Sequence, residues 1–431
     1  MHSSPTAAAD AAAAAFQAWS ALGPTARRAL LNRAADEIAA RADAFVALMA
    51  EELRASEPWA RFNVMLGAAM VREAAALTTQ ITGEVIPSDK PGLLSLALRE
   101  PVGVVLGIAP WNAPVILGCR AIATPLACGN TVVFKASERC PRTHGLIAEA
   151  FAAAGFPDDV VNLVTNDPAD AAEVVGALID HPAVRRINFT GSTHVGRMVA
   201  RRASEHLKPV LLELGGKAPL VVLEDADLEE AVAAAAFGAF MNAGQICMST
   251  ERIIVVEAIA EEFARRLAAK AAAMPAPAIG RQVDESAEAN LRALVDDALS
   301  SGARQIGTGP AILLDGVTPQ MRLYRDESFG PVVGIIRVAD EEEAIRVAND
   351  GEYGLSAAVF TRDAARGLRV ARRIRSGICH VNGPTVHDEP QMPFGGVGAS
   401  GYGRFGGKWG IDAFTELRWI TIAGEPGDYP I

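Results

Sequence analysis

The sequence predicts an α/β protein built from two doubly wound domains. From residue 101 onward, short β-branched runs alternate with helical patterns, which is typical of parallel sheets covered by helices. Residues 7–82 have a helical pattern throughout, and a bulky strand lies at 414–422. A chain of 431 residues is long enough for two or three domains with sizeable cores.

The first part of the chain is predicted to form amphipathic helices. Residues 7–82 are rich in alanine, and charged residues such as Arg27 and Asp36 are spaced around apolar faces. This segment therefore precedes the region of alternating strands and helices as a helical block.

The first set of strands and helices follows residue 101. Strands are predicted at "VGVVLGIAP" (102–110), "TVVFKAS" (131–137), "VVNLVT" (160–165) and "RRINFT" (185–190). Helices are predicted at "THGLIAEAFAAAG" (143–155) and "PADAAEVVGALI" (168–179). The apolar run 101–119 contains three prolines and three glycines, so we interpret it as strands and turns rather than as a membrane span.

The segment "PVLLELGG" (209–216) opens a second set of elements. Its helices are predicted at 227–242, 260–273, 341–349 and 363–375. Its strands are predicted at 252–256, 332–338 and 356–360. The late strand 414–422 has bulky residues on both faces, so it is either an edge strand of its own domain or a pairing surface for another subunit.

Composition excludes several classes of protein. The net charge of −11 and the lack of basic clusters argue against a nucleic-acid-binding surface. The five cysteines are an odd number without CxxC spacing, which favours a reducing compartment over disulfides or a metal site. The start of the chain lacks the basic region of a signal peptide. We therefore expect a cytoplasmic protein that binds no membrane and no metal.

Two segments are candidates for binding a nucleotide. "NFTGSTHVGR" (188–197) places a glycine turn and Ser192 at a helix start, where free N–H groups suit a phosphate; the alternative is a plain serine N-cap. "FKASE" places Lys135 and Glu138 at a strand end. A carboxylate there can bind two ribose hydroxyls and repels a 2′-phosphate, which favours NAD over NADP. The alternative is two solvated charges on a loop.

Four further residues are candidates for chemistry. Glu213 interrupts an apolar strand, where desolvation would raise its pKa toward the range of a general base; the alternative is a buried glutamate satisfied by donors. Asn112 lies between prolines and is either an oxyanion donor or a turn cap. Cys247, in the glycine-led loop "GQICMSTER" (244–252), is either a nucleophile or an inert thiol. Glu327, in the turn "DESFGP", is equally open alone.

Taken together, these motifs resemble a known family. "PWN", "KASE", "FTGST", "LELGGKAP", "GQIC", "ESFGP" and "PFGG" occur in the order and at the separations of the aldehyde dehydrogenase superfamily, from about residue 10 to residue 422. The longer segments "WNAPVILGCRAIATPLACGNTVV", "GQICMSTER" and "HDEPQMPFGG" look like its salicylaldehyde and vanillin dehydrogenase branch, which oxidises aromatic aldehydes.

The resemblance implies a mechanism. Cys247 matches the nucleophile that attacks the aldehyde carbon, and the Asn112 amide with the Cys247 backbone N–H stabilises the oxyanion. Hydride passes to NAD and leaves a thioester. Glu213 matches the base that activates water and releases the carboxylic acid.

The resemblance also implies which residues bind the cofactor and the aldehyde. The cofactor residues implied are Ile108, Pro110, Trp111, Lys135, Ser137, Glu138, Gly191, Ser192, Val195, Gly196, Leu214, Gly215, Glu327 and Phe329. The residues expected near the aldehyde are Arg120, Ile246, Met248, Val386 and His387.

In this family one Rossmann-like domain binds NAD and a second carries the cysteine. We therefore assign 1–82 and 102–213 to the NAD-binding domain and 214–411 to the catalytic domain. A β extension, 83–101 and 412–431, is expected to build a homodimer or homotetramer.

Arg120 replaces a bulky aromatic that the general family often has eight positions after the oxyanion asparagine. One hypothesis is that its guanidinium contacts a phenolic oxygen or carboxylate on the substrate ring; the alternative is a surface or interdomain ion pair.

Two other functions stay open. One is a catalytically silent binding or structural relative, because the chain starts several dozen residues later than family members and two loops between 270 and 316 look shortened. The other is a coenzyme-A-acylating dehydrogenase, although retention of Glu213 favours hydrolysis.

Overall fold

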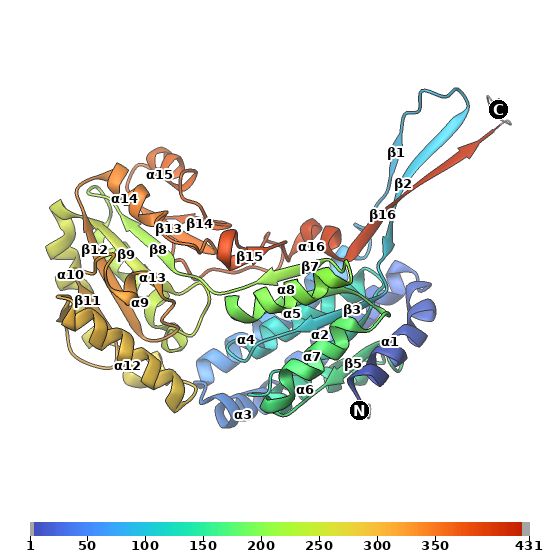
Figure 1. The fold of residues 1–431 in the computed structure, drawn as a ribbon, viewed down its shortest axis with the longest axis horizontal. Helices are drawn as coiled ribbons and strands as arrows, with labels where there is room; N and C mark the ends of the chain where they lie inside the picture. The colour runs from blue at the N-terminus through green and yellow to red at the C-terminus, as the bar shows by residue number, and fades with distance from the viewer. Residues whose placement is uncertain (1–3, 425–431) are drawn as a thin grey trace.

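Three β-sheets organise the part of the chain that the structure describes, residues 4–424. In this computed structural model two α/β domains lie side by side, and a narrow β arm projects from one of them (Figure 1). The predicted pair of α/β domains is confirmed. The ends of the predicted ranges, 1–3 and 425–431, lie outside the described residues.

Helices fill the N-terminal region, as its alanine-rich pattern predicts. They are α1 (Pro5–Ser20), α2 (Pro24–Ala40), α3 (Ala42–Leu53) and α4 (Glu57–Leu77). Proline stands in the first turn of α1, α2 and α4, where its missing N–H removes no helical hydrogen bond. Leu31, Phe45 and Trp59 on these helices are buried in one core with the helices of the first sheet.

The first sheet has the strand order β15-β7-β6-β3-β4-β5. The strands are β3 (Val104–Ile108), β4 (Thr131–Lys135), β5 (Val161–Val164), β6 (Val184–Thr190), β7 (Val210–Glu213) and β15 (Gly401–Tyr402). All neighbours are parallel except β15, which runs antiparallel to β7. Its helices are α5 (Pro114–Ala127), α6 (Pro141–Ala153), α7 (Ala171–Asp180) and α8 (Thr193–Glu205). Residues that follow β3, β4, β6 and β7 therefore meet at one edge.

The second sheet has the strand order β10-β11-β12-β9-β8-β13-β14. The strands are β8 (Ala218–Val222), β9 (Thr250–Val256), β10 (Arg304–Ile306), β11 (Ile312–Asp315), β12 (Val332–Val338), β13 (Ser356–Phe360) and β14 (Ile378–Val381). Only the β10–β11 pair is antiparallel among these strands. The helices are α9 (Leu228–Phe240), α10 (Glu257–Ala272), α11 (Ala276–Ile279), α12 (Glu285–Ser300), α13 (Arg322–Arg325), α14 (Glu341–Ala348) and α15 (Ala364–Ala371).

The strand β7 belongs to the first sheet. The segment "PVLLELGG" therefore does not open the second set, because β7 pairs with β6 and the second set begins at β8. Gly401–Tyr402, expected in the catalytic domain, pair with β7 in the first sheet. Hydrophobic periodicity indicates which residues of a strand are buried, but it does not indicate which strand is the pairing partner. The sheet to which β7 belongs therefore could not be predicted from the sequence pattern.

The run 101–119 is a strand followed by a helix, so the expectation of strands and turns alone was wrong. Pro114 begins α5, where a residue without an N–H is well tolerated. Gly118 lies inside that helix because a Cβ there would come within 2.6 Å of Ile147 Cδ1 on α6. Within residues 4–424, no helix combines the length and apolar character needed to cross a membrane.

The β arm is a three-stranded antiparallel sheet. Its strands are β1 (Glu84–Ile86), β2 (Leu93–Pro101) and β16 (Thr415–Ala423), in the order β1-β2-β16. The helix α16 (Gly407–Phe414) leads into β16. β16 is thus an edge strand of its own chain's sheet, and its second edge has no strand beside it among the described residues.

Candidate active site

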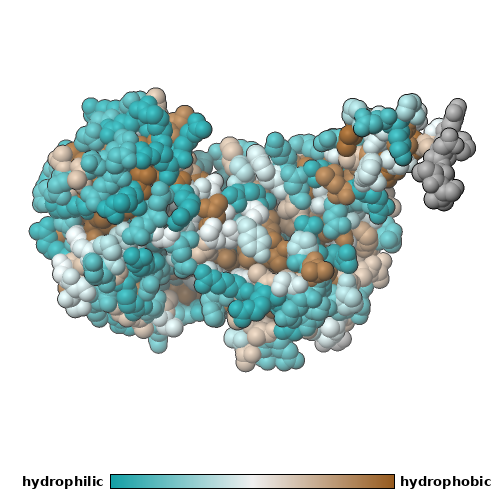
Figure 2. Space-filling view, turned by 45° about the horizontal axis from the view of Figure 1, so that its top comes forward, coloured by the Kyte–Doolittle hydropathy of each residue, from teal (hydrophilic) through white to brown (hydrophobic). Residues whose placement is uncertain are grey.

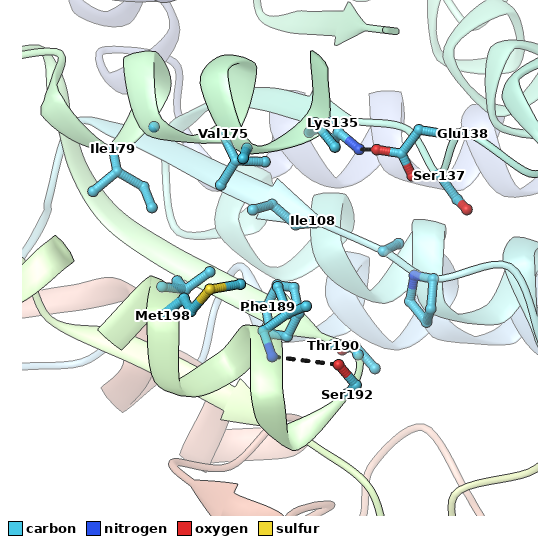
Figure 3. Close-up of a pocket in the computed structure, with 18 of the residues that line it drawn as sticks. Ile108, Lys135, Ser137, Glu138, Val175, Ile179, Phe189, Thr190, Ser192 and Met198 are labelled. Atoms are coloured by element: carbon cyan, nitrogen blue, oxygen red, sulfur yellow. Dashed lines mark hydrogen bonds and ion pairs between the residues drawn. The ribbon is translucent and has the colours of Figure 1, made fainter. Parts of the chain in front are cut away.

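A cavity of about 580 Å³ lies at the carboxyl ends of β3, β4 and β6 (Figure 3). Open parallel sheets bind ligands at this edge, and the volume is typical of a cofactor site. Nine of the residues expected to bind the cofactor line the cavity: Ile108, Pro110, Trp111, Lys135, Ser137, Glu138, Gly191, Ser192 and Val195. The structure therefore brings together residues from three separate motifs.

The other five expected cofactor residues lie outside this lining and pack against one another or against Trp111. A Cβ on Gly196 would lie 2.4 Å from Leu214 Cδ2, so helix α8 approaches the end of β7 closely. A Cβ on Gly215 would lie 2.4 Å from Glu327 Oε2. Phe329 contacts Trp111 edge to face, with 5.8 Å between ring centroids.

Lys135 and Glu138 form an ion pair inside the cavity (Figure 3). Asn166 Nδ2 donates a second hydrogen bond to the same Glu138 oxygen at 3.2 Å. Burial tends to raise the pKa of Glu138, but the hydrogen bonds from Lys135 and Asn166 outweigh it and hold that pKa below its ordinary value. The carboxylate is therefore charged at neutral pH, and the reading of two solvated loop charges is wrong.

Ser192 caps helix α8. Its side-chain oxygen accepts a hydrogen bond from the backbone N–H of Val195 at 3.3 Å (Figure 3). The plain N-cap reading is therefore correct locally. Because Ser192 and Gly191 also line the cavity, the same helix start faces the space where a phosphate would lie.

The apolar end of this cavity was not predicted from the sequence. Val175, Gly176 and Ile179 on α7 and Met198 on α8 line it (Figure 3). The sequence signal was the helical spacing of apolar residues in "AEVVGALI" (172–179). An apolar face at a sheet crevice is suited to a flat aromatic ring.

Cys247 follows a tight turn between α9 and β9. The 3-10 helix η2 (Met241–Gly244) contains three consecutive residues with positive φ, at Asn242, Ala243 and Gly244. Gly244 has φ +69°, and a Cβ there would lie 2.1 Å from the Gly330 carbonyl oxygen. Cys247 remains partly exposed, whereas Cys119, Cys128 and Cys140 are buried. The glycine lets the loop that carries Cys247 approach the neighbouring turn closely.

Asn112 lies directly against the loop that carries Cys247. Its side-chain Nδ2 donates to the carbonyl oxygen of Gln245 at 2.9 Å, and its own backbone carbonyl accepts from Trp59 Nε1 at 3.1 Å. Asn112 is buried. These contacts hold the Asn112 amide against Gln245, which is two residues before Cys247 in the sequence.

Glu213 ends β7 and is almost fully buried. Within the described structure neither carboxylate oxygen accepts a hydrogen bond of ordinary geometry, although the Gly396 backbone N–H lies near enough to lower the pKa of Glu213. Burial raises the pKa of Glu213 to about 8, while the positive charges of Arg120 and Arg404 act in the opposite direction. The predicted rise in pKa is therefore confirmed, and its cause is desolvation.

Desolvation also raises the pKa of the Cys247 thiol, and the carboxylates of Glu213 and Glu327 raise it further. The side chain is thus a neutral thiol at neutral pH. Gly216 and Cys247 lie close together, since a Cβ on Gly216 would lie 2.3 Å from the Cys247 carbonyl oxygen.

The turn that holds Glu327 faces the glycine pair after Glu213. Glu327 Oε1 accepts a hydrogen bond from the Gly216 backbone N–H at 2.8 Å. Burial raises the pKa of Glu327 to about 7, and nearby Glu251 adds to the rise. The carboxyl end of β7, the start of β9 and the turn before β12 therefore lie close together.

Arg120, on α5, is buried and paired. Its Nη2 lies 2.5 Å from Asp388 Oδ2, and its guanidinium lies 4.3 Å from the ring centroid of Phe394. The other ends of the pair, Arg120 Nη1 and Asp388 Oδ1, have no hydrogen-bond partner within the described structure. The ion-pair reading of Arg120 is correct, but the pair is buried rather than on the surface.

The other residues expected near the aldehyde are not equally placed. Ile246 and Met248, on either side of Cys247, are buried in the core that also includes the N-terminal helices. Val386 is partly buried and packs against the same core. His387 is exposed and lies 3.0 Å from Glu389 Oε1.

Two α/β domains with a cavity of cofactor size at the carboxyl ends of parallel strands are typical of an enzyme that binds a cofactor. The chain belongs to the aldehyde dehydrogenase family, whose sequence pattern matches residues 3–420. It is therefore an enzyme that oxidises aldehydes, and the resemblance predicted from the motifs is confirmed. Members of this family use NAD or NADP.

Individual relatives agree with this assignment. Vanillin dehydrogenase from Pseudomonas fluorescens is 57% identical over 439 residues, which cover 99% of this chain and 91% of the relative. Salicylaldehyde dehydrogenase from Pseudomonas sp. (strain C18) is 48% identical over 438 residues, with 98% and 91% covered. The crystal structure of a salicylaldehyde dehydrogenase from Pseudomonas putida G7 complexed with salicylaldehyde superposes with a TM-score of 0.97 at 48% identity and covers 99% of this chain and 91% of that one.

Proposed function

We propose that this protein oxidises aromatic aldehydes to carboxylic acids with NAD, through a thioester on Cys247. One observation supports this proposal most directly: Asn112 and the turn after Glu213 both contact the loop of Cys247, and Asn112 directly follows Trp111, which lines the cavity. The similarity to vanillin and salicylaldehyde dehydrogenases supports an aromatic substrate.

The residues of the cavity fit a dinucleotide. The apolar surface of Val175 and Ile179 suits an adenine ring, and Glu138 would accept hydrogen bonds from the adenosine ribose. The start of α8 at Ser192 would face the phosphates. Because Glu138 is ionised, a 2′-phosphate placed beside it would be repelled, which supports NAD over NADP. Bound NAD would accept the hydride from the substrate carbon.

The residues around Cys247 would carry the remaining steps. The sulfur, once deprotonated, bonds to the aldehyde carbon, and the former carbonyl oxygen becomes an oxyanion. Asn112 uses one N–H for Gln245, which leaves its second N–H for this oxyanion together with the backbone N–H of Cys247.

Loss of hydride from the substrate carbon leaves an acyl group on the sulfur. Glu213 then takes a proton from water, the resulting hydroxide attacks the thioester carbon, and the carbon–sulfur bond breaks to give the acid and the free cysteine. The two open oxygens of Glu213 are available for that water.

Arg120 would contribute to the choice of aldehyde. The unpartnered Arg120 Nη1 and Asp388 Oδ1 offer one donor and one acceptor side by side. A phenolic hydroxyl can accept from the first and donate to the second, whereas an unsubstituted ring can do neither. Val386 and His387 would lie on the same loop as Asp388, and Ile246 and Met248 would shape the wall behind Cys247.

The β arm would mediate a homodimer or homotetramer. Val85 on β1 and Leu417, Trp419 and Ile422 on β16 are between 55% and 74% exposed. Figure 2 shows apolar side chains among polar ones on this projecting arm. Exposed apolar residues on an open sheet edge are typical of an association surface.

The function is tested by following NADH and acid together. Purified protein is given salicylaldehyde, vanillin, benzaldehyde and short aliphatic aldehydes, with NAD or NADP, and with or without coenzyme A. We expect NADH and free acid from aromatic aldehydes with NAD alone, and no NADH from Cys247→Ala. NADH that requires coenzyme A would identify an acylating enzyme, no NADH would indicate a silent relative, and a preference for aliphatic aldehydes would remove the aromatic assignment.

A further inference from the structure

A buried carboxylate that the proposed mechanism does not use lies four residues after Cys247. Glu251 is at the start of β9 and is 3% exposed. Its Oε2 lies 2.6 Å from Nζ of Lys217, which is 4% exposed and follows the glycine pair after Glu213. Burying an ion pair costs desolvation energy, so such a pair persists only where further hydrogen bonds stabilise it.

Further hydrogen bonds reach Glu251 from a third segment. The backbone N–H of Ser328 donates to it at 3.0 Å, the Ser328 hydroxyl at 2.8 Å, and the backbone N–H of Phe329 at 3.2 Å. One carboxylate therefore connects the segment after Glu213, the strand after Cys247 and the turn that holds Glu327.

The turn held by Glu251 has a conformation that needs such support. Phe329 has φ +46°, a left-handed backbone that residues other than glycine rarely adopt. Two of the Glu251 hydrogen bonds are made to consecutive N–H groups in this turn, at Ser328 and Phe329. The turn also directs the Glu327 carboxylate toward the Gly216 N–H and the Phe329 ring toward Trp111.

Hydrogen bonds hold both the side chain and the backbone carbonyl of Lys217, so it is a rigid partner for Glu251. Its Nζ donates to Glu251, and its carbonyl oxygen accepts from Arg252 Nε at 3.2 Å. Arg252 in turn donates to the carbonyl oxygens of Val347 and Ala348 at the end of α14. The connection therefore extends from the site into the second domain.

We infer that Glu251, paired with Lys217, is a positioning residue for the cofactor: it holds Glu327 and Phe329 where the nicotinamide ribose of NAD binds. The inference rests on the proposed function, because it assumes that these two residues face the cofactor. Neither Glu251 nor Lys217 lines the nucleotide cavity, so both act through the turn rather than by contact.

Glu251→Gln tests the inference, because the amide keeps the size of the side chain but loses the charge, and its NH₂ faces N–H donors. The Kd and KM for NAD are measured with the KM for aldehyde. We expect the Kd and KM for NAD to rise about tenfold or more, and the KM for aldehyde to change by less than about threefold. Glu251→Asp, which restores the charge, is expected to recover part of the NAD affinity.

Asp315→Asn is the matched control. Asp315 is also buried in the second sheet and accepts from Arg304 and Arg337, but it contacts no residue of the proposed site. We expect it to lower the thermal midpoint of unfolding without changing the Kd for NAD. Equal loss of NAD affinity in both variants would overturn the inference, because the effect would then be general destabilisation.

Ser328→Ala keeps the inference testable if Glu251→Gln does not fold. It removes only the hydroxyl donor to Glu251, and we expect the Kd for NAD to rise about two- to fivefold. An unchanged Kd for NAD in the folded variants would overturn the positioning role even if the wild-type protein oxidises aldehydes normally. Wild-type protein that neither binds NAD nor forms NADH would instead overturn the proposed function.

Discussion

Glu213 and Cys247 lie in the same water-poor region, and their protonation states are coupled through it. Desolvation raises both pKa values, and the Glu213 carboxylate itself raises that of the thiol. A charge on either group makes a charge on the other less favourable. Both groups are therefore protonated at neutral pH, and the proposed reaction must remove one proton from the Cys247 sulfur and one from the Glu213 carboxyl group.

This coupling predicts a pH dependence for release of the acid. With a pKa of about 8, Glu213 gains its charge as the pH rises through 8, and only the charged form accepts a proton from water. We expect the deacylation rate to increase between about pH 7 and pH 9. In Glu213→Gln we expect deacylation to fall about 100-fold or more and to lose this inflection. A first-turnover burst of NADH retained in the variant would assign Glu213 to the second half-reaction, whereas loss of the burst would contradict that assignment.

From the position of Arg120 we expect the enzyme to discriminate between aldehydes with a hydroxyl-substituted ring and aldehydes with an unsubstituted ring. Arg120→Ala is expected to lower kcat/KM for salicylaldehyde about tenfold more than for benzaldehyde, since a charge-assisted hydrogen bond contributes roughly 1.5–3 kcal/mol. Because Ala leaves Asp388 unpaired, the double variant Arg120→Met, Asp388→Asn serves as the control that removes both charges. An equal loss on the two aldehydes would remove the hypothesis of ring recognition.

The turn η2 and strand β9 act together as the element that presents the sulfur. Three residues with positive φ precede Gln245, and Gly244 approaches Gly330 more closely than any side chain would permit. Gln245 then bonds across to Asn112 and to Val283, so the loop is fixed from both domains. The position of the sulfur thus depends on backbone contacts more than on the residues beside it.

Gly244→Ala tests this dependence. The added methyl group would meet the Gly330 carbonyl at 2.1 Å in a left-handed conformation. We expect a loss of about 2 kcal/mol or more in the free energy of unfolding and slower alkylation of Cys247 by iodoacetamide. Gly351→Ala is the control, because nothing lies within 4 Å of its added Cβ. Equal stability and labelling in the two variants would show that the close approach at Gly244 is not required.

The whole molecule combines a largely buried site with a β arm that contacts little of its own chain. The arm extends beyond both domains (Figure 1). Its β2–β16 pairing satisfies one edge of β16, while Leu417 and Trp419 remain exposed. Trp419 Nε1 donates to Ser95 Oγ at 2.7 Å, but most of the apolar surface of both side chains stays in water in a single subunit, so we expect a second copy of the chain to cover it.

Leu417→Glu combined with Trp419→Glu is therefore expected to reduce the oligomer to monomers, as measured by light scattering after size exclusion. Met65→Glu and Leu368→Glu are the controls, because both residues are exposed apolar side chains away from the arm. A monomeric wild-type protein, or an unchanged oligomer in the arm variant, would contradict the role assigned to the β arm.

The elements of the fold followed from the sequence wherever periodicity was strong. The strands at 131–137, 332–338 and 356–360 and the N-terminal helices were predicted close to their observed bounds. The helix α5 was missed because Pro114, Gly118 and Pro125 are residues that usually end helices. In this structure Pro114 is at the helix start, and Gly118 is required by the close contact with α6.

Residue types alone identified the family and a candidate set of reactive residues, because seven motifs occur in one order along the chain. How those residues act on one another follows from the folded chain. It showed that Arg120 is already paired with Asp388, that Glu251 connects three segments, and that the apolar side of α7 faces the nucleotide cavity. The physical reason is that burial and pairing depend on neighbours distant in the chain, and desolvation, which sets the proton affinity of Glu213 and Cys247, exists only once those neighbours have come together.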